Sequence, residues 1–232
     1  MSAWLVHAFT ASGVVLAYLA IEAIVAGAVR DAFIYLAIAT GVDSVDGVLA
    51  RLARVKERTP QFDGALLDNI IDYLTFTLVP VFLLRQQRLL PDDPAGVAIA
   101  VAVLLSSAYG FCRTDAKTTD HFFTGFPSYW NIVALYMVGL GTSPTTNAIA
   151  LIIFVALVFV PIGYVYPSRT PKWQALSVGL GLAWGAAMAL VIWTLPSPPA
   201  WLVWGSLLYP VYYGALSLYL HARRGRGRHV AD

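Results

Sequence analysis

Four aspartates lie close together in a chain that is otherwise strongly apolar, and their spacing is that of residues on helix faces. Asp43 and Asp46 are three residues apart, and Asp68 and Asp72 are four apart. Residues three or four apart lie on one side of a helix, so each pair presents two carboxylates in one direction. Small residues at matching positions leave room for a bulky group to approach the backbone. These small residues are Gly47, Ala50 and Gly64.

Carboxylates among apolar helices are costly unless cations neutralise them, and two neighbouring pairs repel each other unless bound metal absorbs the charge. Ligand sets made only of oxygen select hard divalent ions, so this pattern favours Mg²⁺ or Mn²⁺. The alternative is that the aspartates lie at solvated helix ends and pair with nearby basic residues. Those basic residues are Arg51, Arg54, Lys56 and Arg58.

The aspartates also belong to a longer motif. The segments DSVDG, VLAR, GALLD and NIID follow the pattern D-x2-D-G-x2-A-R … G-x3-D-x3-D. This pattern resembles the signature of the CDP-alcohol phosphatidyltransferase family. The twelve residues from 52 to 63, which separate the arginine from the second glycine, make a longer gap than most family members have. The long gap and the segment 111–136 resemble the bacterial phosphatidylcholine synthase branch of the family.

The composition is that of an integral membrane protein. Hydrophobic residues make up 59% of the chain and charged residues 12%, whereas soluble domains have about 25% charged residues. Apolar runs of about 20 residues recur along almost the whole length, which a soluble protein with a large core would not need. The single cysteine, Cys112, excludes an internal disulfide and a cysteine metal cluster. No signal peptide precedes the first apolar run, so we expect that run to remain in the protein.

The apolar segments predict an all-α, polytopic membrane bundle of about eight transmembrane helices, with the whole chain, 1–232, as one domain. The predicted spans are 7–28, 31–52, 64–84, 95–113, 128–142, 146–166, 173–195 and 200–221. The family core has six spans, so the resemblance makes 173–221 an addition of the branch. The polar segment 113–127 is expected to be either an interfacial helix or a loop that closes on substrate.

The distribution of basic residues predicts the orientation. Only Arg30, Arg85 and Arg88, of the fifteen Lys and Arg residues, lie on the side opposite the loop after the second span. Basic loops stay in the cytoplasm, so that loop, the aspartates beside it and both termini are expected on the cytoplasmic side. With the resemblance, this indicates a bacterial inner (cytoplasmic) membrane. The basic tail 221–232 is expected to lie against anionic headgroups, and no nucleic-acid-binding fold accompanies it.

The resemblance implies a reaction and assigns roles to the motif. CDP-diacylglycerol would be the donor and CMP the leaving group, with two divalent ions clamping the pyrophosphate. Asp43, Asp46 and Asp68 would be metal ligands, and Asp72 would combine metal binding with general-base catalysis. The nucleotide would contact Asp46, Gly47, Ala50, Arg51 and Gly64. For Arg51, the alternative is an interfacial arginine whose head reaches the lipid headgroups.

The acceptor has to be inferred from other residues. Phosphorylated alcohols would need a basic pocket, and few basic residues lie beyond the motif; Arg113 and Lys117 are candidates for binding lipid phosphate or headgroups. Aromatic residues crowd the segment 121–136 instead, and Trp and Tyr faces bind quaternary ammonium ions. An aromatic cage of this kind would suit choline, and an interfacial aromatic belt is the alternative. The resemblance of the segment 121–131 to the phosphatidylcholine synthase branch is what favours choline. The candidate choline-binding residues are Glu22, Tyr73, His121, Tyr129, Trp130, Asn131 and Tyr166.

The sequence therefore predicts an enzyme that condenses CDP-diacylglycerol with choline to give phosphatidylcholine and CMP. The nearest alternative is the same chemistry with serine, inositol phosphate or glycerol phosphate as acceptor. A transporter or lipid-binding membrane protein without catalysis is the alternative from a different class. Partners implied by the resemblance are the two substrates, membrane lipids and a second copy of the chain, since family members are commonly homodimers.

Overall fold

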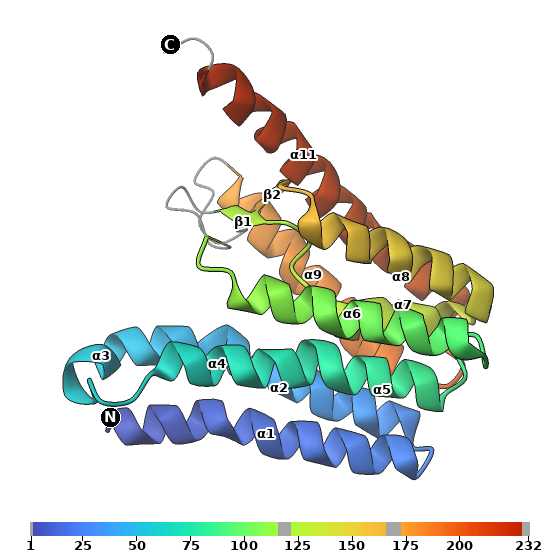
Figure 1. Cartoon of the computed structure of the whole chain (residues 1–232), viewed down its shortest axis with the longest axis horizontal. Coiled ribbons are helices and arrows are strands. Elements are labelled where there is room, and N and C mark those ends of the chain that lie inside the picture. Colours follow the sequence, from blue (N-terminus) through green and yellow to red (C-terminus); the bar gives the residue numbers. More distant parts are fainter. Residues whose placement is uncertain (1, 116–121, 166–172, 229–232) are drawn as a thin grey trace.

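The computed structural model describes residues 2–115, 122–165 and 173–228, and these are almost entirely helical. The first layer of the bundle contains α1, α2 and a long composite helix, which Figure 1 shows lying roughly parallel. Their bounds are α1 Ala3–Val25, α2 Val29–Leu52, the short α3 Val55–Arg58, α4 Gly64–Asp72, the π-helical η1 Tyr73–Leu78 and α5 Val79–Gln86. The four motif aspartates all belong to this layer, on α2 and α4.

The second half of the chain packs over this layer, and its C-terminal helix points away from the layer (Figure 1). It contains α6 Pro94–Cys112, β1 Phe122–Thr124, α7 Trp130–Leu140, α8 Pro144–Phe159, β2 Gly163–Val165, α9 Gln174–Trp193, α10 Ala200–Ser206 and α11 Leu208–Arg228. The two strands pair antiparallel, with Phe122 opposite Val165. The main core lies between the layers and includes Phe33, Leu83, Leu84, Trp130 and Val191.

Five helical stretches in the described part of the chain are long and apolar enough to cross a membrane. They are α1, α2, the continuous stretch Gly64–Gln86, α6 and α9, while α7 and α8 are shorter apolar helices. Each predicted span has a helical counterpart, so the prediction of an all-α multi-pass membrane protein is confirmed.

The prediction was wrong at one segment. The span predicted to run to residue 166 ends at Phe159, and residues 163–165 form β2. Pro161 explains the ending, because a residue before proline is pushed out of the helical region, and Val160 is indeed extended with ψ 124°. In the described part of the segment 113–127, Phe122–Thr124 forms a strand that pairs with β2, and whether the segment closes on substrate stays a prediction. Residues 116–121 of that segment lie outside the described residues.

The helix that carries Asp68 and Asp72 has a sharply defined start. The carboxylate of Asp63 accepts hydrogen bonds from the backbone N–H groups of Ala65 and Leu66, each at 3.0 Å. Such an N-cap satisfies donors that the first helical turn leaves unpaired. After Asp72 the helix widens into η1, just before Pro80, which has no N–H to give the carbonyl of Phe76.

Candidate active site

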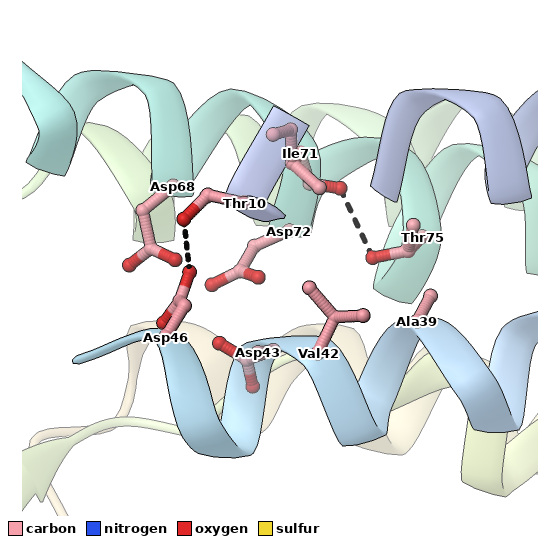
Figure 2. Close-up of a pocket in the computed structure, with 9 residues that line it drawn as sticks. All are labelled: Thr10, Ala39, Val42, Asp43, Asp46, Asp68, Ile71, Asp72 and Thr75. Carbon is pink, nitrogen blue, oxygen red and sulfur yellow. Dashed lines mark hydrogen bonds between the residues drawn. The ribbon is translucent and has the colours of Figure 1, made fainter. Parts of the chain in front are cut away.

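Three of the motif aspartates meet between α2 and α4. Asp43, Asp68 and Asp72 each offer one carboxylate oxygen such that these atoms all lie within 4.8 Å of one another. Figure 2 shows Asp43 rising from α2 towards Asp68 and Asp72 on the facing helix. All three side chains are half-buried. The predicted convergence of the two halves of the motif is therefore present, and residues 25 positions apart share one site.

Asp46 lines the same cavity but has a further partner. Its Oδ2 accepts a 2.8 Å hydrogen bond from the hydroxyl of Thr10 on α1 (Figure 2). Both side chains are buried, at 7% exposure each. A hydrogen bond to a buried carboxylate fixes its direction, so α1 holds Asp46 in place beside the other three aspartates.

The cavity between the helices is small. Its volume is about 10 Å³, which is close to the space that a single water molecule requires. Apolar walls flank the carboxylates, and the hydroxyl of Thr75 is turned away to the carbonyl of Ile71 at 3.0 Å. The residues that line the cavity are Thr10, Ala39, Val42, Asp43, Asp46, Asp68, Ile71, Asp72 and Thr75.

This donor set fits a hard divalent cation. The converging side chains supply only carboxylate oxygens, which Mg²⁺ and Mn²⁺ prefer over the nitrogen and sulfur ligands that zinc sites use. Three carboxylates within 4.8 Å of one another would otherwise repel strongly in a partly buried site. The aspartate cluster can therefore bind a divalent metal ion, and its composition does not distinguish between the two.

Of the predicted nucleotide-binding residues, Asp46 lines this cavity and the other four do not. Gly47 and Arg51 are exposed on α2, and a Cβ at Gly47 would lie 3.6 Å from Nη1 of Arg51. Ala50 is half-buried and packs against the small cluster formed by α1 and Val55. Gly64 begins α4 and faces a different neighbour, because a Cβ there would lie only 2.8 Å from Cε1 of His7.

The predicted choline-binding aromatics have different surroundings. Tyr129 contacts Phe76, one turn beyond Asp72, with ring centroids 6.2 Å apart. The Tyr73 hydroxyl donates to the carbonyl of Leu104 at 3.2 Å. Trp130 is fully buried in the core, and its indole N–H donates to Ser107 at 2.7 Å. Tyr129, the residue just before α7, is thus the predicted aromatic whose ring contacts Phe76 on the continuation of the aspartate helix.

The remaining predicted residues divide into those near the site and those far from it. Asn131 is buried and donates to the hydroxyl of Thr40, one turn before Asp43 on α2. Glu22 is exposed on α1 and is hydrogen-bonded to Tyr18, so it does not join the cavity. His121, Tyr166 and Lys117 lie outside the described residues.

Arg113, which was predicted to bind lipid phosphate, already has an anionic partner. Its Nε and Nη2 donate to the two carboxylate oxygens of Asp115, both at 2.8 Å. This hydrogen-bonded cation lowers the pKa of Asp115 below its usual value. The guanidinium also lies 5.8 Å from the ring centre of Tyr109. Arg113 therefore helps to shape the start of the segment after α6.

Comparison with known proteins identifies the family. No family model matches the chain. Over 169 residues, 72% of this chain and 66% of the relative, it is 47% identical to a phosphatidylcholine synthase of Legionella pneumophila. A phosphatidylcholine synthase of Pseudomonas aeruginosa is 35% identical over 225 residues, 97% of this chain and 94% of the relative. The chain belongs to the phosphatidylcholine synthase family.

Another phosphatidylcholine synthase, from Rhizobium meliloti, is 34% identical over 227 residues and matches 97% of this chain. The match to the Legionella pneumophila phosphatidylcholine synthase spans just under two thirds of that protein, whereas the matches to the Pseudomonas and Rhizobium proteins span 94% and 93% of them. The resemblance predicted from the motif and from the segment 111–136 is thereby confirmed for the phosphatidylcholine synthase branch.

The sequence reasoning did not identify several polar residues near the site of this phosphatidylcholine synthase family member. Thr10 binds Asp46, and His7, one turn earlier on α1, lies 3.0 Å from the Thr59 hydroxyl in the connection to α4. A signal was present, because His7 and Thr10 are polar residues three apart in an apolar helix. Tyr164 and Tyr213 were also missed; their rings stack with centroids 6.3 Å apart.

Proposed function

We propose that this chain transfers a phosphatidyl group from CDP-diacylglycerol to choline, giving phosphatidylcholine and CMP. The observation that carries the proposal is the convergence of Asp43, Asp68 and Asp72 from α2 and α4 into one oxygen-only cluster. The name of the relatives supports choline as the acceptor. A non-catalytic transporter would not need three carboxylates from two helices within 4.8 Å of one another.

The reaction needs two substrates and one proton acceptor. The choline hydroxyl attacks the phosphorus that bears diacylglycerol, the bond from that phosphorus to the CMP oxygen breaks, and CMP leaves with that oxygen. Asp72 accepts the proton of the hydroxyl as general base. Divalent ions, Mg²⁺ or Mn²⁺, would supply charge neutralisation to the pyrophosphate when bound by Asp43, Asp68 and Asp72. Thr10 keeps Asp46 directed at the same cavity.

The nucleotide half of the donor is proposed to lie along the exposed side of α2. Gly47 leaves the backbone open beside Arg51, whose guanidinium reaches back to within 3.6 Å of the position of the missing Cβ. A flexible cation in that place would bind the pyrophosphate or the nucleotide phosphate. The cavity of about 10 Å³ holds an ion or a water but no phosphate, so the phosphate groups approach from the Gly47 side.

The trimethylammonium group of choline is proposed to bind the aromatic cluster that begins at Tyr129. Tyr129 contacts Phe76 on η1 and lies within electrostatic reach of Tyr213 on α11, which stacks on Tyr164 of β2. Aromatic faces attract a quaternary ammonium ion by about 2 kcal/mol or more when water is excluded. Phe76 links this cluster to the site, because it lies on η1, which continues the helix that carries Asp72.

The membrane position follows from the same chemistry. The acyl chains of the donor require the bilayer and its nucleotide requires water, so the cluster is proposed at the cytoplasmic boundary of a bacterial inner membrane. The basic residues near the α2–α4 connection support this side. A homodimer is proposed as the assembly.

The test is an acceptor assay with the purified protein. Protein in detergent is given labelled CDP-diacylglycerol, Mg²⁺ or Mn²⁺, and choline, serine, inositol phosphate or glycerol phosphate in turn. We expect phosphatidylcholine and CMP in equal amounts with choline. Asp72→Asn should lower turnover by at least about 10²-fold, whereas Asp92→Asn, at an exposed loop position after α5, should retain it. Incorporation of another acceptor in place of choline would overturn the proposal.

A further inference from the structure

His7 is a buried histidine with a defined partner in the connection between α2 and α4. It is 6% exposed, and its Nε2 lies 3.0 Å from the hydroxyl oxygen of Thr59. The Thr59 hydroxyl donates its one hydrogen to the carbonyl of Val55 at 3.0 Å. It must therefore accept from His7, which places the proton of the imidazole on Nε2. Thr59 is itself 2% exposed, so this bond is shielded from water.

The other contacts of the His7 ring are to the residues that lead into α4. The ring centre lies 4.4 Å from that of Phe62, and Trp4 closes the cluster with centroids 5.7 Å from His7 and 5.6 Å from Phe62. At Gly64 a Cβ would lie 2.8 Å from Cε1 and 3.2 Å from Nδ1 of the same ring. The imidazole thus occupies the space that any side chain at position 64 would need.

We propose that His7 is a positioning residue that fixes the start of α4, and that Gly64 lacks a side chain in order to admit the His7 ring. Glycine is not required there by backbone conformation, because Gly64 is the first residue of α4 and its φ lies outside the left-handed region. Alanine would be favoured at a helical position on intrinsic grounds. Space beside His7 is therefore what restricts the position.

The consequence for the site follows from the geometry of α4. Asp63 caps this helix, and Asp68 and Asp72 follow one and two turns later on it. A shift at Gly64 moves both carboxylates relative to Asp43 on α2. Thr10, three residues after His7, holds Asp46 from the same side of α1. One face of α1 thereby sets the positions of both halves of the motif.

The inference rests on the proposed function only for the role of α4, and it competes with the assignment of Gly64 to the nucleotide slot. If Gly64 is small for the nucleotide, removing the His7 side chain leaves Gly64→Ala as damaging as before. If it is small for His7, His7→Ala creates the room that the alanine needs. A double-mutant cycle therefore separates the two explanations.

The experiment compares Gly64→Ala, His7→Ala and the double variant in the purified full chain. The readouts are the KM for CDP-diacylglycerol, kcat, the melting temperature and calorimetric binding of CMP. Gly13→Ala, alone and with His7→Ala, is the matched control, because a Cβ at Gly13 meets Ile71 and not His7. Gly41→Ala, where nothing lies within 4 Å, should behave as the parent chain.

We expect Gly64→Ala to lower kcat/KM for CDP-diacylglycerol by about tenfold, and addition of His7→Ala to recover at least about threefold of it. His7→Gln keeps a hydrogen-bond donor for Thr59, so its kcat/KM should fall less than that of His7→Ala. A double variant no more active than Gly64→Ala, or equal recovery of Gly13→Ala, would overturn the inference. CMP binding recovers in the double variant even if choline proves not to be the acceptor, so the two proposals fail separately.

Discussion

The hydrogen bond between Thr10 and Asp46 provides a quantitative test of the site. Thr10→Val keeps the shape of the side chain and removes the hydroxyl that donates to Oδ2 of Asp46. Both groups are 7% exposed, so water replaces the lost donor poorly. A hydrogen bond to a charged group contributes about 1.5 to 3 kcal/mol. If Asp46 must be fixed for turnover, kcat/KM falls by about 10- to 150-fold.

The assay is the rate of phosphatidylcholine formation at several choline, donor and metal concentrations, with Thr10→Ser as the matched control that keeps the hydroxyl. A positioning role predicts that Thr10→Val lowers activity while the metal concentration for half-maximal rate rises, and that Thr10→Ser stays near the parent value. The melting temperature separates these effects from unfolding. Thr10→Val activity within about twofold of the parent would refute the argument, because about 0.4 kcal/mol is below the value of any buried charged hydrogen bond.

Four further outcomes are expected. Thorough treatment with EDTA should abolish turnover, and added Mg²⁺ or Mn²⁺ should restore it; survival of activity without metal would contradict the carboxylate cluster as a metal site. Asp72→Asn should lower kcat by about 10²- to 10⁴-fold with CMP binding retained, as measured by calorimetry, because it removes the proton acceptor. Tyr129→Ala should raise the KM for choline by about tenfold with little change in the KM for the donor. Trp130→Ala should instead lower the melting temperature, because the ring is fully buried. A rise in the KM for choline without a change in melting temperature would contradict the assignment of Trp130 to the core.

The helices were predictable because their apolar runs and breakers are local signals. Gly141 after α7 and Ser143 with Pro144 before α8 end and start helices by their own backbone chemistry. The pairing of β1 with β2 was not predictable in this way. Phe122 and Val165 are more than forty residues apart in the sequence. Neither short segment shows the alternation of apolar and polar residues that is typical of a strand. Their pairing depends on α11, whose Ser217 and His221 side chains accept from the β2 backbone.

The aspartates of the site could be predicted because helix periodicity and the motif both place them on facing helices. The residues that orient them could not be found from spacing alone. Thr10, for example, lies 36 positions before Asp46 and on a different helix. Conversely, Trp130 and Tyr129 are neighbours in sequence but one is sealed in the core and the other reaches Phe76. Only the direction of α7 separates these two roles.

The contacts of α1 explain why a helix without any motif residue is needed at the site. Asp43 and Asp46 on α2 and Asp68 and Asp72 on α4 carry like charges that push the two helices apart before a cation binds. The connection between them, residues 53–63, is long and largely exposed, so it cannot hold them at a fixed distance. α1 contacts both helices, through Thr10 to Asp46 and through His7 to Thr59 and the start of α4. A cation that bound there would find its ligands already close together, which would reduce the reorganisation needed in each proposed turnover.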